Sequence, residues 1–268
     1  MTTAQLDLTT PRVNFFRLVG VEFRKMFDTR AGLAYGSFTV AVLLLVTLIA
    51  SSALAALQAY GSAPSLKVWV YVLLVTLSIL LPVFPIMVAT AEWTQRTGLT
   101  TFTLEPVRIK VLAAKFVAVL GLSVITLAVA LAIAAAANGI FSGPWDADPG
   151  FLGVELLRLA LFFMVAFAVA ALTMNTVAAL WIYYLAAFLG RFIFAALIGV
   201  SEAWDRLGPS LDLNLALDEL SGRGISRHAL FGSGPSSESW VHVAIAATIW
   251  VIIPLVFGVI RWTRAEVK

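Results

Sequence analysis

Few side chains in this chain of 268 residues combine type and spacing in a way that predicts chemistry. Glu92 and Arg96 are four residues apart, a spacing at which a carboxylate and a guanidinium pair on one helix face. Arg191 lies in a long apolar stretch, where burying a lone guanidinium costs about 3 kcal/mol. It must therefore face protein or water. The sequence leaves two interpretations open: a structural pair with Glu155 or an acid of segment 201–240, or a pathway residue that contacts an anionic ligand or forms a gate.

Motifs of common catalytic and nucleotide-binding sites do not occur in the sequence. The patterns GxSxG, HExxH and the P-loop GxxxxGK[ST] are all missing, and the chain has no cysteine. His228 and His242 have no partner at the spacing of a zinc site. We therefore expect no catalytic residue, no metal site and no cofactor in this chain, and we do not expect it to be an enzyme by itself.

The composition indicates that much of the protein faces lipid. Hydrophobic residues make up 61% of the chain, charged residues make up 12%, and the mean hydropathy is +0.97. A soluble domain carries about 25% charged residues, and much of any folded surface must face its solvent. The sequence therefore predicts an all-α integral membrane protein. The net charge of +3 does not indicate nucleic-acid binding, because the basic residues follow the predicted membrane sides.

Apolar windows of about 20 residues, the length that crosses a bilayer, occur six times. The first begins near residue 34 and is too long for a signal peptide, so we expect the preceding segment 1–30 to be retained. Residues 31–268 would form one six-helix transmembrane domain. Pro82 and Pro85 predict a kink in the second span. The predicted spans are residues 34–57, 68–91, 116–140, 152–172, 177–200 and 241–260.

Basic residues predict the orientation of the spans, because they are enriched on the cytoplasmic side. If segment 1–30 is cytoplasmic, twelve of the eighteen Lys and Arg residues fall on that side, and many acidic residues fall on the other. We therefore expect a multi-pass protein with both termini in the cytoplasm. The alanine-rich, cysteine-free composition favours a bacterial plasma membrane.

Segment 1–30 contains a predicted amphipathic helix that contacts membrane lipid. Its apolar and basic residues recur at helical spacing on opposite sides, as in helices that lie along a membrane interface. Such a helix could be an anchor, a lever that touches a cytoplasmic partner, or both. The apolar residues are Phe16, Val19, Phe23, Met26 and Phe27, and the charged ones are Arg17, Arg24, Lys25 and Asp28.

Segment 92–115, between the second and third spans, is much longer than a turn requires. Residues 100–104 are predicted to form a short helix that exposes Phe102 and Leu104. Pro106 then ends it, because proline lacks an amide donor. Three basic residues would hold the entry of the third span at the cytoplasmic face: Arg108, Lys110 and Lys115.

This loop resembles that of the permease subunits of ABC-2 type (type V) ABC transporters. In that family, a Glu is followed five residues later by Thr, and then by Leu, Pro, Arg and Lys at intervals. The family often has Gly just before the Thr, where this chain has Arg96. The six-span layout with its N-terminal interfacial helix resembles the family over nearly the whole chain. The matching residues are Glu92, Thr97, Leu104, Pro106, Arg108 and Lys115.

The resemblance implies a membrane subunit of an ATP-driven exporter, whose short cytoplasmic coupling helix docks on a separate ABC ATPase subunit. That ATPase would bind ATP and Mg, and a second permease copy or a paralogue would complete the membrane part. Segment 201–240 would include re-entrant helices, although an ordinary outer loop also fits its sequence. The residues expected to couple the loop to the ATPase are Glu92, Arg96, Thr97, Phe102, Leu104, Pro106 and Arg108.

Two other classes of membrane protein remain open. An ATP-independent channel or ion-coupled carrier is one, although carriers commonly show internal repeats or several ionisable residues within their spans. Arg191 stands almost alone in this respect. A membrane-embedded lipid enzyme is the less favoured class, because it would need polar residues that converge at one membrane depth.

Overall fold

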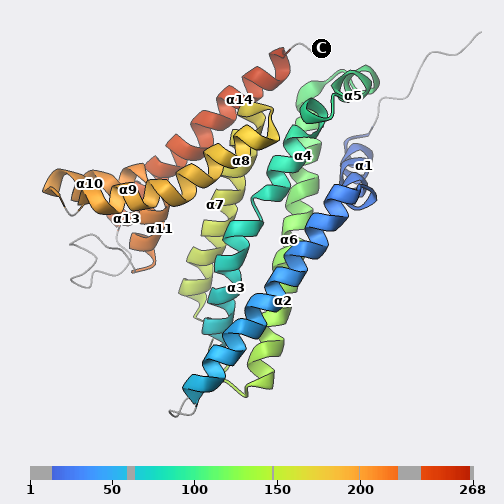
Figure 1. The fold of residues 1–268 in the computed structure, drawn as a ribbon. Helices are drawn as coiled ribbons and strands as arrows, with labels where there is room; N and C mark the ends of the chain where they lie inside the picture. Colours follow the sequence, from blue (N-terminus) through green and yellow to red (C-terminus); the bar gives the residue numbers. More distant parts are fainter. Residues whose placement is uncertain (1–13, 59–63, 147, 199, 223–236, 266–268) are drawn as a thin grey trace, which may run out of the picture.

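Helices and the turns between them make up the residues that the structure, a computed structural model, describes: 14–58, 64–146, 148–198, 200–222 and 237–265 (Figure 1). Six helical segments are long and apolar enough to cross a membrane, and each contains or overlaps one predicted span. The predictions of an all-α chain and of six candidate membrane-spanning helices are therefore confirmed. These segments are residues 30–53, 66–94, 108–140, 149–173, 176–194 and 237–264.

The described elements include two π-helical turns, which lie within the fifth and sixth spans. The elements are α1 (Phe15–Asp28), α2 (Arg30–Gln58), α3 (Leu66–Leu80), α4 (Val83–Thr94), α5 (Gly98–Leu104), α6 (Arg108–Ile140), α7 (Pro149–Thr173), α8 (Thr176–Tyr184), η1 (Leu185–Gly190), α9 (Arg191–Ile198), α10 (Glu202–Leu211), α11 (Leu213–Leu220), α13 (Ser237–Ala247), η2 (Thr248–Ile252) and α14 (Ile253–Arg264).

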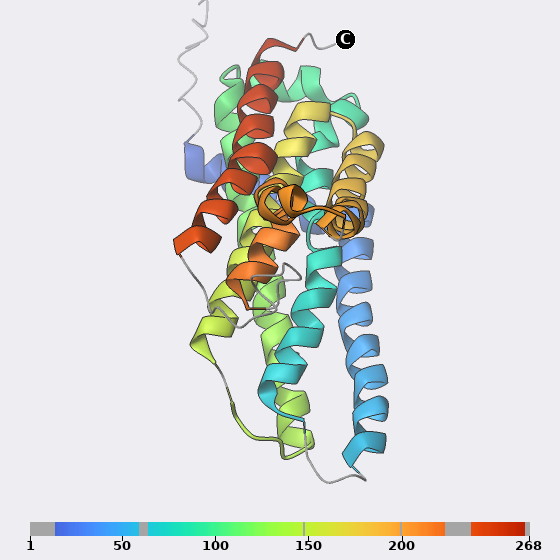
Figure 2. The ribbon, with the colours of Figure 1, turned by 90° about the vertical axis from the view of Figure 1, so that its left-hand side faces the viewer.

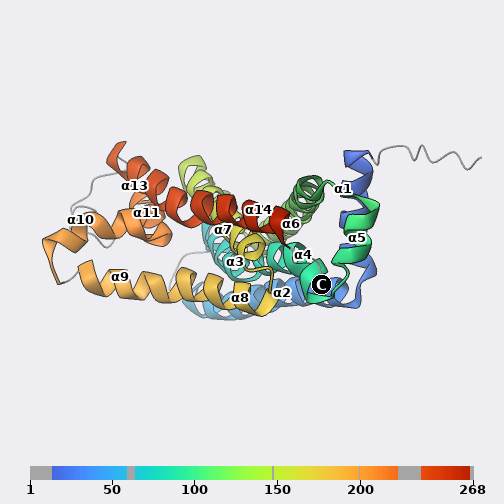
Figure 3. The same cartoon turned by 90° about the horizontal axis from the view of Figure 1, so that it is seen from above.

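The long helices α2, α3, α6 and α7 run side by side, and α1, α5 and the end of α14 lie at one end of this bundle (Figure 1). We call this the terminal end, and the opposite end, where α6 turns into α7, the far end. Viewed from above, α1 and α5 lie at one edge of the molecule and α9, α10 and α13 at the opposite edge (Figure 3). The short helices α9 and α10 cross the direction of the long helices (Figure 2).

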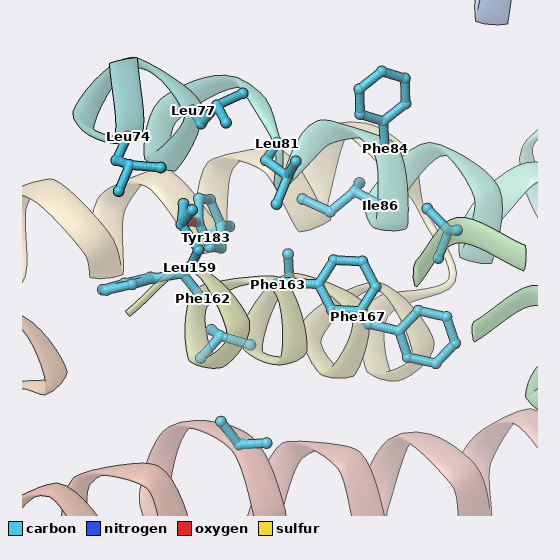
Figure 4. Close-up of a cluster of buried hydrophobic side chains, with 14 of the residues drawn as sticks. Leu74, Leu77, Leu81, Phe84, Ile86, Leu159, Phe162, Phe163, Phe167 and Tyr183 are labelled. Carbon is cyan, nitrogen blue, oxygen red and sulfur yellow. The ribbon is translucent and has the colours of Figure 1, made fainter. Parts of the chain in front are cut away.

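Helix α7 forms the centre of the bundle, since its apolar window is the most buried of the six. Leu74, Leu77 and Leu81 lie on one side of the core cluster and Phe162 and Phe163 of α7 on the other, with Tyr183 of α8 between them (Figure 4). Lipid tails are as apolar as these side chains, so close van der Waals packing stabilises this core more than the removal of water does.

The second span is broken between α3 and α4, which confirms the kink predicted from Pro82 and Pro85. Prolines remove amide donors, and the bend separates others from their carbonyls. Two tyrosine hydroxyls occupy carbonyls at the break: Tyr35 of α2 donates to Leu80 O at 2.7 Å, and Tyr184 of α8 donates to Ile79 O at 2.6 Å. Helices α2 and α8 are therefore both attached to the bend.

The predicted amphipathic helix is α1, and one of its faces packs on α6. Leu18, Glu22 and Met26 are buried, whereas Phe16 and Phe27 are exposed. The buried residues recur every four positions, and of the three only Met26 belongs to the predicted apolar set. Residues 1–13 of the predicted N-terminal segment lie outside the described residues.

Two predicted boundaries are corrected. The third span is part of a helix that begins at Arg108 rather than near residue 116, because only Pro106 interrupts the helical stretch. Segment 201–240 contains two helices, α10 and α11, and then the start of α13, while its residues 223–236 lie outside the described part of the chain. Helix α11 is buried along much of its length and packs against α7 and α13.

Candidate functional site

The loop between α4 and α6 turns sharply at Arg96. Its φ of 56° is the left-handed conformation, which side chains with a Cβ adopt at a cost of about 1–2 kcal/mol. Thr97 follows and donates its N–H to Glu92 O at 3.0 Å, which closes the turn before α5 begins at Gly98. Arg96 thus has the backbone conformation that a glycine in this position would adopt freely. The side chains of Arg96 and Thr97 are exposed.

Phe102 faces the protein rather than solvent, so the prediction that it is exposed is wrong. Its ring centroid lies 6.0 Å from that of Trp93 in α4 and 6.4 Å from that of Trp262 in α14. The two tryptophan rings are themselves 5.3 Å apart, edge to face. Such pairs add about 0.5–1.5 kcal/mol each beyond burial. These rings hold α5 against two spans.

The exposed apolar side chains of α5 are Leu99 and Leu104 instead, with exposed fractions of 58% and 75%. Leu104 was predicted to be exposed, and it is. Pro106 follows the helix and is exposed, in agreement with the predicted end of α5. Helix α5 thus presents two large apolar side chains away from the bundle at its terminal end.

Arg108 links the start of α6 to α5 and to the end of α14. Its guanidinium lies 4.8 Å from the centroid of the Phe102 ring, a cation–π contact. The same group donates to the carbonyl of Ala265 and, at 3.4 Å, to Thr263 O. These carbonyls lie at the C-terminal end of α14, where the last turn has no helical donors.

A buried ion-pair network joins α1, α4 and α6, and we call it the Lys115 network. Lys115 Nζ lies 2.6 Å from Glu92 Oε1 and 2.8 Å from Glu22 Oε2, and Lys25 Nζ lies 2.6 Å from Glu22 Oε1. Lys115 is 1% exposed, and both carboxylates are nearly as buried. This arrangement corrects two predictions: Glu92 pairs with Lys115 rather than Arg96, and Lys115 lies in the interior rather than at the membrane surface.

Two carboxylates near the terminal end have shifted proton affinities. Burial raises the pKa of Glu22, but the charge and hydrogen bonds of Lys115 and Lys25 outweigh it, so the net pKa lies below the ordinary value. At the end of α5, a hydrogen bond from Lys110, at 2.7 Å, lowers the pKa of Glu105. Both groups are therefore ionised at neutral pH and keep their partners in place.

A second charged cluster surrounds Arg191, which corrects the expectation that this residue stands almost alone. Asp218 of α11 bridges two arginines: its Oδ2 lies 2.9 Å from Arg191 Nη2, and its Oδ1 lies 2.7 Å from Arg158 Nη2. Arg158 Nε also lies 3.4 Å from Glu155 Oε2. Of the two partners expected for Arg191, the acid of segment 201–240 is the one found.

The π-helical turn η1 attaches this cluster to the fifth span. Asn214 of α11 donates to Ala187 O within η1 at 2.8 Å, and Asn214 Oδ1 accepts from Arg158 Nη1 at 3.4 Å. A π-turn displaces carbonyls from the regular helical ladder, and such turns are common at functional sites. Helix α11 is therefore connected to both the fourth and the fifth spans by polar contacts.

One further pair of titratable side chains joins two helices. His242 Nδ1 lies 2.8 Å from Glu219 Oε2, a pair that joins α13 to α11, and His228 lies outside the described residues. Within the described ranges, no three His, Asp or Glu side chains are grouped so that they could hold a metal ion.

Comparisons of the chain with family models, with curated proteins and with solved structures found no match. The functional argument therefore depends on the geometry. That geometry brings Phe102 and Arg108 together and pairs Glu92 with Lys115 in the interior. The side chains of Arg96, Thr97, Leu104 and Pro106 remain exposed.

The sequence interpretation missed the roles of three residues at the terminal end. Glu22 could have been found from its position four residues from both Leu18 and Met26, which form one helix face. Trp93 and Trp262 carried no such signal, because a tryptophan at the end of a span is typical of the membrane interface.

Proposed function

We propose that this chain is the membrane subunit of an ABC-2 type exporter and that α5 is its coupling helix, which docks on a separate ATPase subunit. The observation that carries this proposal is the exposure of two large apolar side chains of α5, Leu99 and Leu104. The helix lies between two spans, outside the stretches that cross the membrane. Large apolar side chains that are exposed there are typical of a protein-binding surface.

The attachment of α5 supports a mechanical role. The Phe102, Trp93 and Trp262 rings connect it to α4 and α14, and the Arg108 contacts connect it to α6. A displacement of α5 would therefore move three spans together, because packed side chains resist local deformation. The Lys115 network would extend the same movement to α1.

The movement of α5 would change the geometry of the second span at its bend. Helix α4 leads from the coupling helix to the break at Pro82, where the hydroxyls of Tyr35 and Tyr184 hold α2 and α8. A change in the angle between α3 and α4 would alter these contacts.

In the proposed cycle the ATPase binds ATP and Mg, and a second permease copy or paralogue forms the other membrane half. The complex would lie in a bacterial plasma membrane, with both termini of this chain cytoplasmic. Helices α10 and α11 would be the re-entrant elements.

The test is purification of the tagged chain from its native membrane in a mild detergent, followed by mass spectrometry of stoichiometric partners. We expect an ATPase with a P-loop at about one copy per chain. Leu104→Glu should reduce the recovered ATPase about tenfold or more, which corresponds to about 1.4 kcal/mol of binding free energy, while the chain still inserts. Val200→Glu, which also places a glutamate at an exposed apolar residue, between α9 and α10, is the control. A complex that repeatedly lacks an ATPase would refute the proposal.

An ion-coupled carrier is the second candidate, and the charged cluster around Asp218 is the observation that favours it. Carriers commonly place several ionisable residues within their spans, and Glu155, Arg158 and Arg191 all lie within candidate spans here. Transport by the purified chain in vesicles that contain an ion gradient but no ATPase would favour this function over the first.

A further inference from the structure

A cavity of about 210 Å³ lies between α3, α7, the η1–α9 segment and α11. Its lining combines apolar surface with the charged cluster described above, so an occupant would meet both kinds of group. The apolar wall includes Val75, Ile79 and Phe188, each about two-fifths exposed in the structure. None of these side chains takes part in the contacts of α5 at the terminal end, although the backbone carbonyl of Ile79 accepts from Tyr184 at the break in the second span.

Arg191 is the charged side chain of this lining that is most exposed to a ligand in the cavity. Both oxygens of Asp218 are occupied by arginines, and Arg158 contacts Glu155, Asn214 and Asp218. Glu155 and Asp218 are buried, whereas the Arg191 side chain is 47% exposed. Asp218 contacts its guanidinium through Nη2, and the charge of Asp212 also acts on it, while the exposed part of the side chain is open to a ligand.

The chemistry of the exposed group identifies the ligand class. A guanidinium presents parallel N–H donors that match the oxygens of a phosphate or carboxylate, and such charge-assisted bonds are stronger in apolar surroundings. Asp218 holds Arg191 in one orientation before a ligand arrives, which reduces the ordering cost of binding. The apolar wall suits a hydrocarbon chain next to that oxyanion.

We propose that this cavity binds the phosphate headgroup of an anionic amphiphile, with Arg191 as the phosphate ligand. The volume is below the roughly 300–1,000 Å³ of sites that enclose a drug-sized molecule, so it accommodates a headgroup, while the hydrocarbon chain lies along Val75, Ile79 and Phe188. The site does not depend on the ATPase: a carrier and an ABC subunit would bind this ligand through the same residues.

The experiment uses the full chain, purified in dodecyl maltoside with any subunit that remains bound, and native mass spectrometry to count ligands. Dihexanoyl phosphatidylglycerol is the probe, dihexanoylglycerol is the uncharged counterpart, and inorganic phosphate is the headgroup without chains. We expect phosphatidylglycerol to bind one per chain and dihexanoylglycerol to bind about tenfold more weakly or not at all. If inorganic phosphate competes at similar concentrations, the site binds free phosphate. If it does not compete, the site binds a lipid.

Two variants separate binding from folding. Arg191→Gln should weaken phosphatidylglycerol binding about tenfold, and Asp218 would still be paired with Arg158 in this variant. Arg206→Gln makes the same change at an exposed arginine of α10 and should bind as the original chain does. Val75→Trp fills the cavity without changing a charge and should also abolish binding. Unchanged binding in both Arg191→Gln and Val75→Trp, or equal binding of dihexanoylglycerol, would overturn the proposal.

Discussion

At the scale of single residues, Lys115 is the most consequential charge at the terminal end. It lies between the carboxylates of Glu22 and Glu92, so its removal would leave two buried negative charges without their shared partner. Breaking a buried pair in this way costs about 3–5 kcal/mol. We expect Lys115→Met to lower the thermal unfolding midpoint strongly in detergent, and Lys115→Met combined with Glu92→Gln to recover part of the loss. Equal midpoints for the original chain and Lys115→Met would contradict this.

Glu22 makes the same network sensitive to acid. Its pKa in the folded protein lies below the unfolded value of 4.5, so the unfolded state binds more protons between these two values. The contribution to stability is therefore complete above pH 4.5 and is lost as the pH falls through the folded pKa. Thermal unfolding measured from pH 7 to pH 3 should show this loss, and Glu22→Gln should be less stable at pH 7 but show a smaller acid dependence. A parallel acid response in both proteins would count against the assignment.

At the scale of elements, the turn before α5 is under backbone strain at Arg96. Its positive φ suits glycine, and the side chain is exposed, so Arg96→Gly should raise the free energy of unfolding by about 1 kcal/mol. Arg96→Val should lower it by a similar amount, because a β-branched residue tolerates this conformation least. Chemical denaturation of both variants in mixed micelles measures the difference. Similar stabilities for Gly and Val would show that the turn has another conformation.

At the scale of the whole molecule, the bundle depends on the close approach of α14 to the central helix α7. A Cβ added to Gly258 would lie 2.9 Å from Leu172 N, 3.1 Å from Ala171 Cβ and 3.2 Å from Ala168 O, so the two helices would have to separate. We expect Gly258→Ala to cost about 1–3 kcal/mol and to loosen the contact of Trp262 with α5. Gly139→Ala in α6 has open space around its new methyl group and is the matched control. Unfolding midpoints measured side by side would reveal a packing effect only in the first variant.

The sequence by itself determined the class of fold. Apolar runs long enough to cross a bilayer predict helices, because a lipid-exposed backbone must satisfy its own hydrogen bonds. Prolines are similarly local in their effect, so Pro82 predicted the bend and Pro106 the end of α5. These features depend on residues close together in the chain.

The tertiary structure alone decided which side chains meet. Glu92 could have paired with Arg96 by spacing, but Lys115 is brought to it by the packing of α4 on α6, and burial strengthens that pair over a solvated one. Phe102 turned inward because Trp262, from the last span, converges with Trp93 of the adjoining span. Asp218 and Arg191 belong to different helices, and only the fold of α11 against α7 and α9 places both arginines on one carboxylate. No periodicity encodes such contacts, since they join residues far apart in the chain.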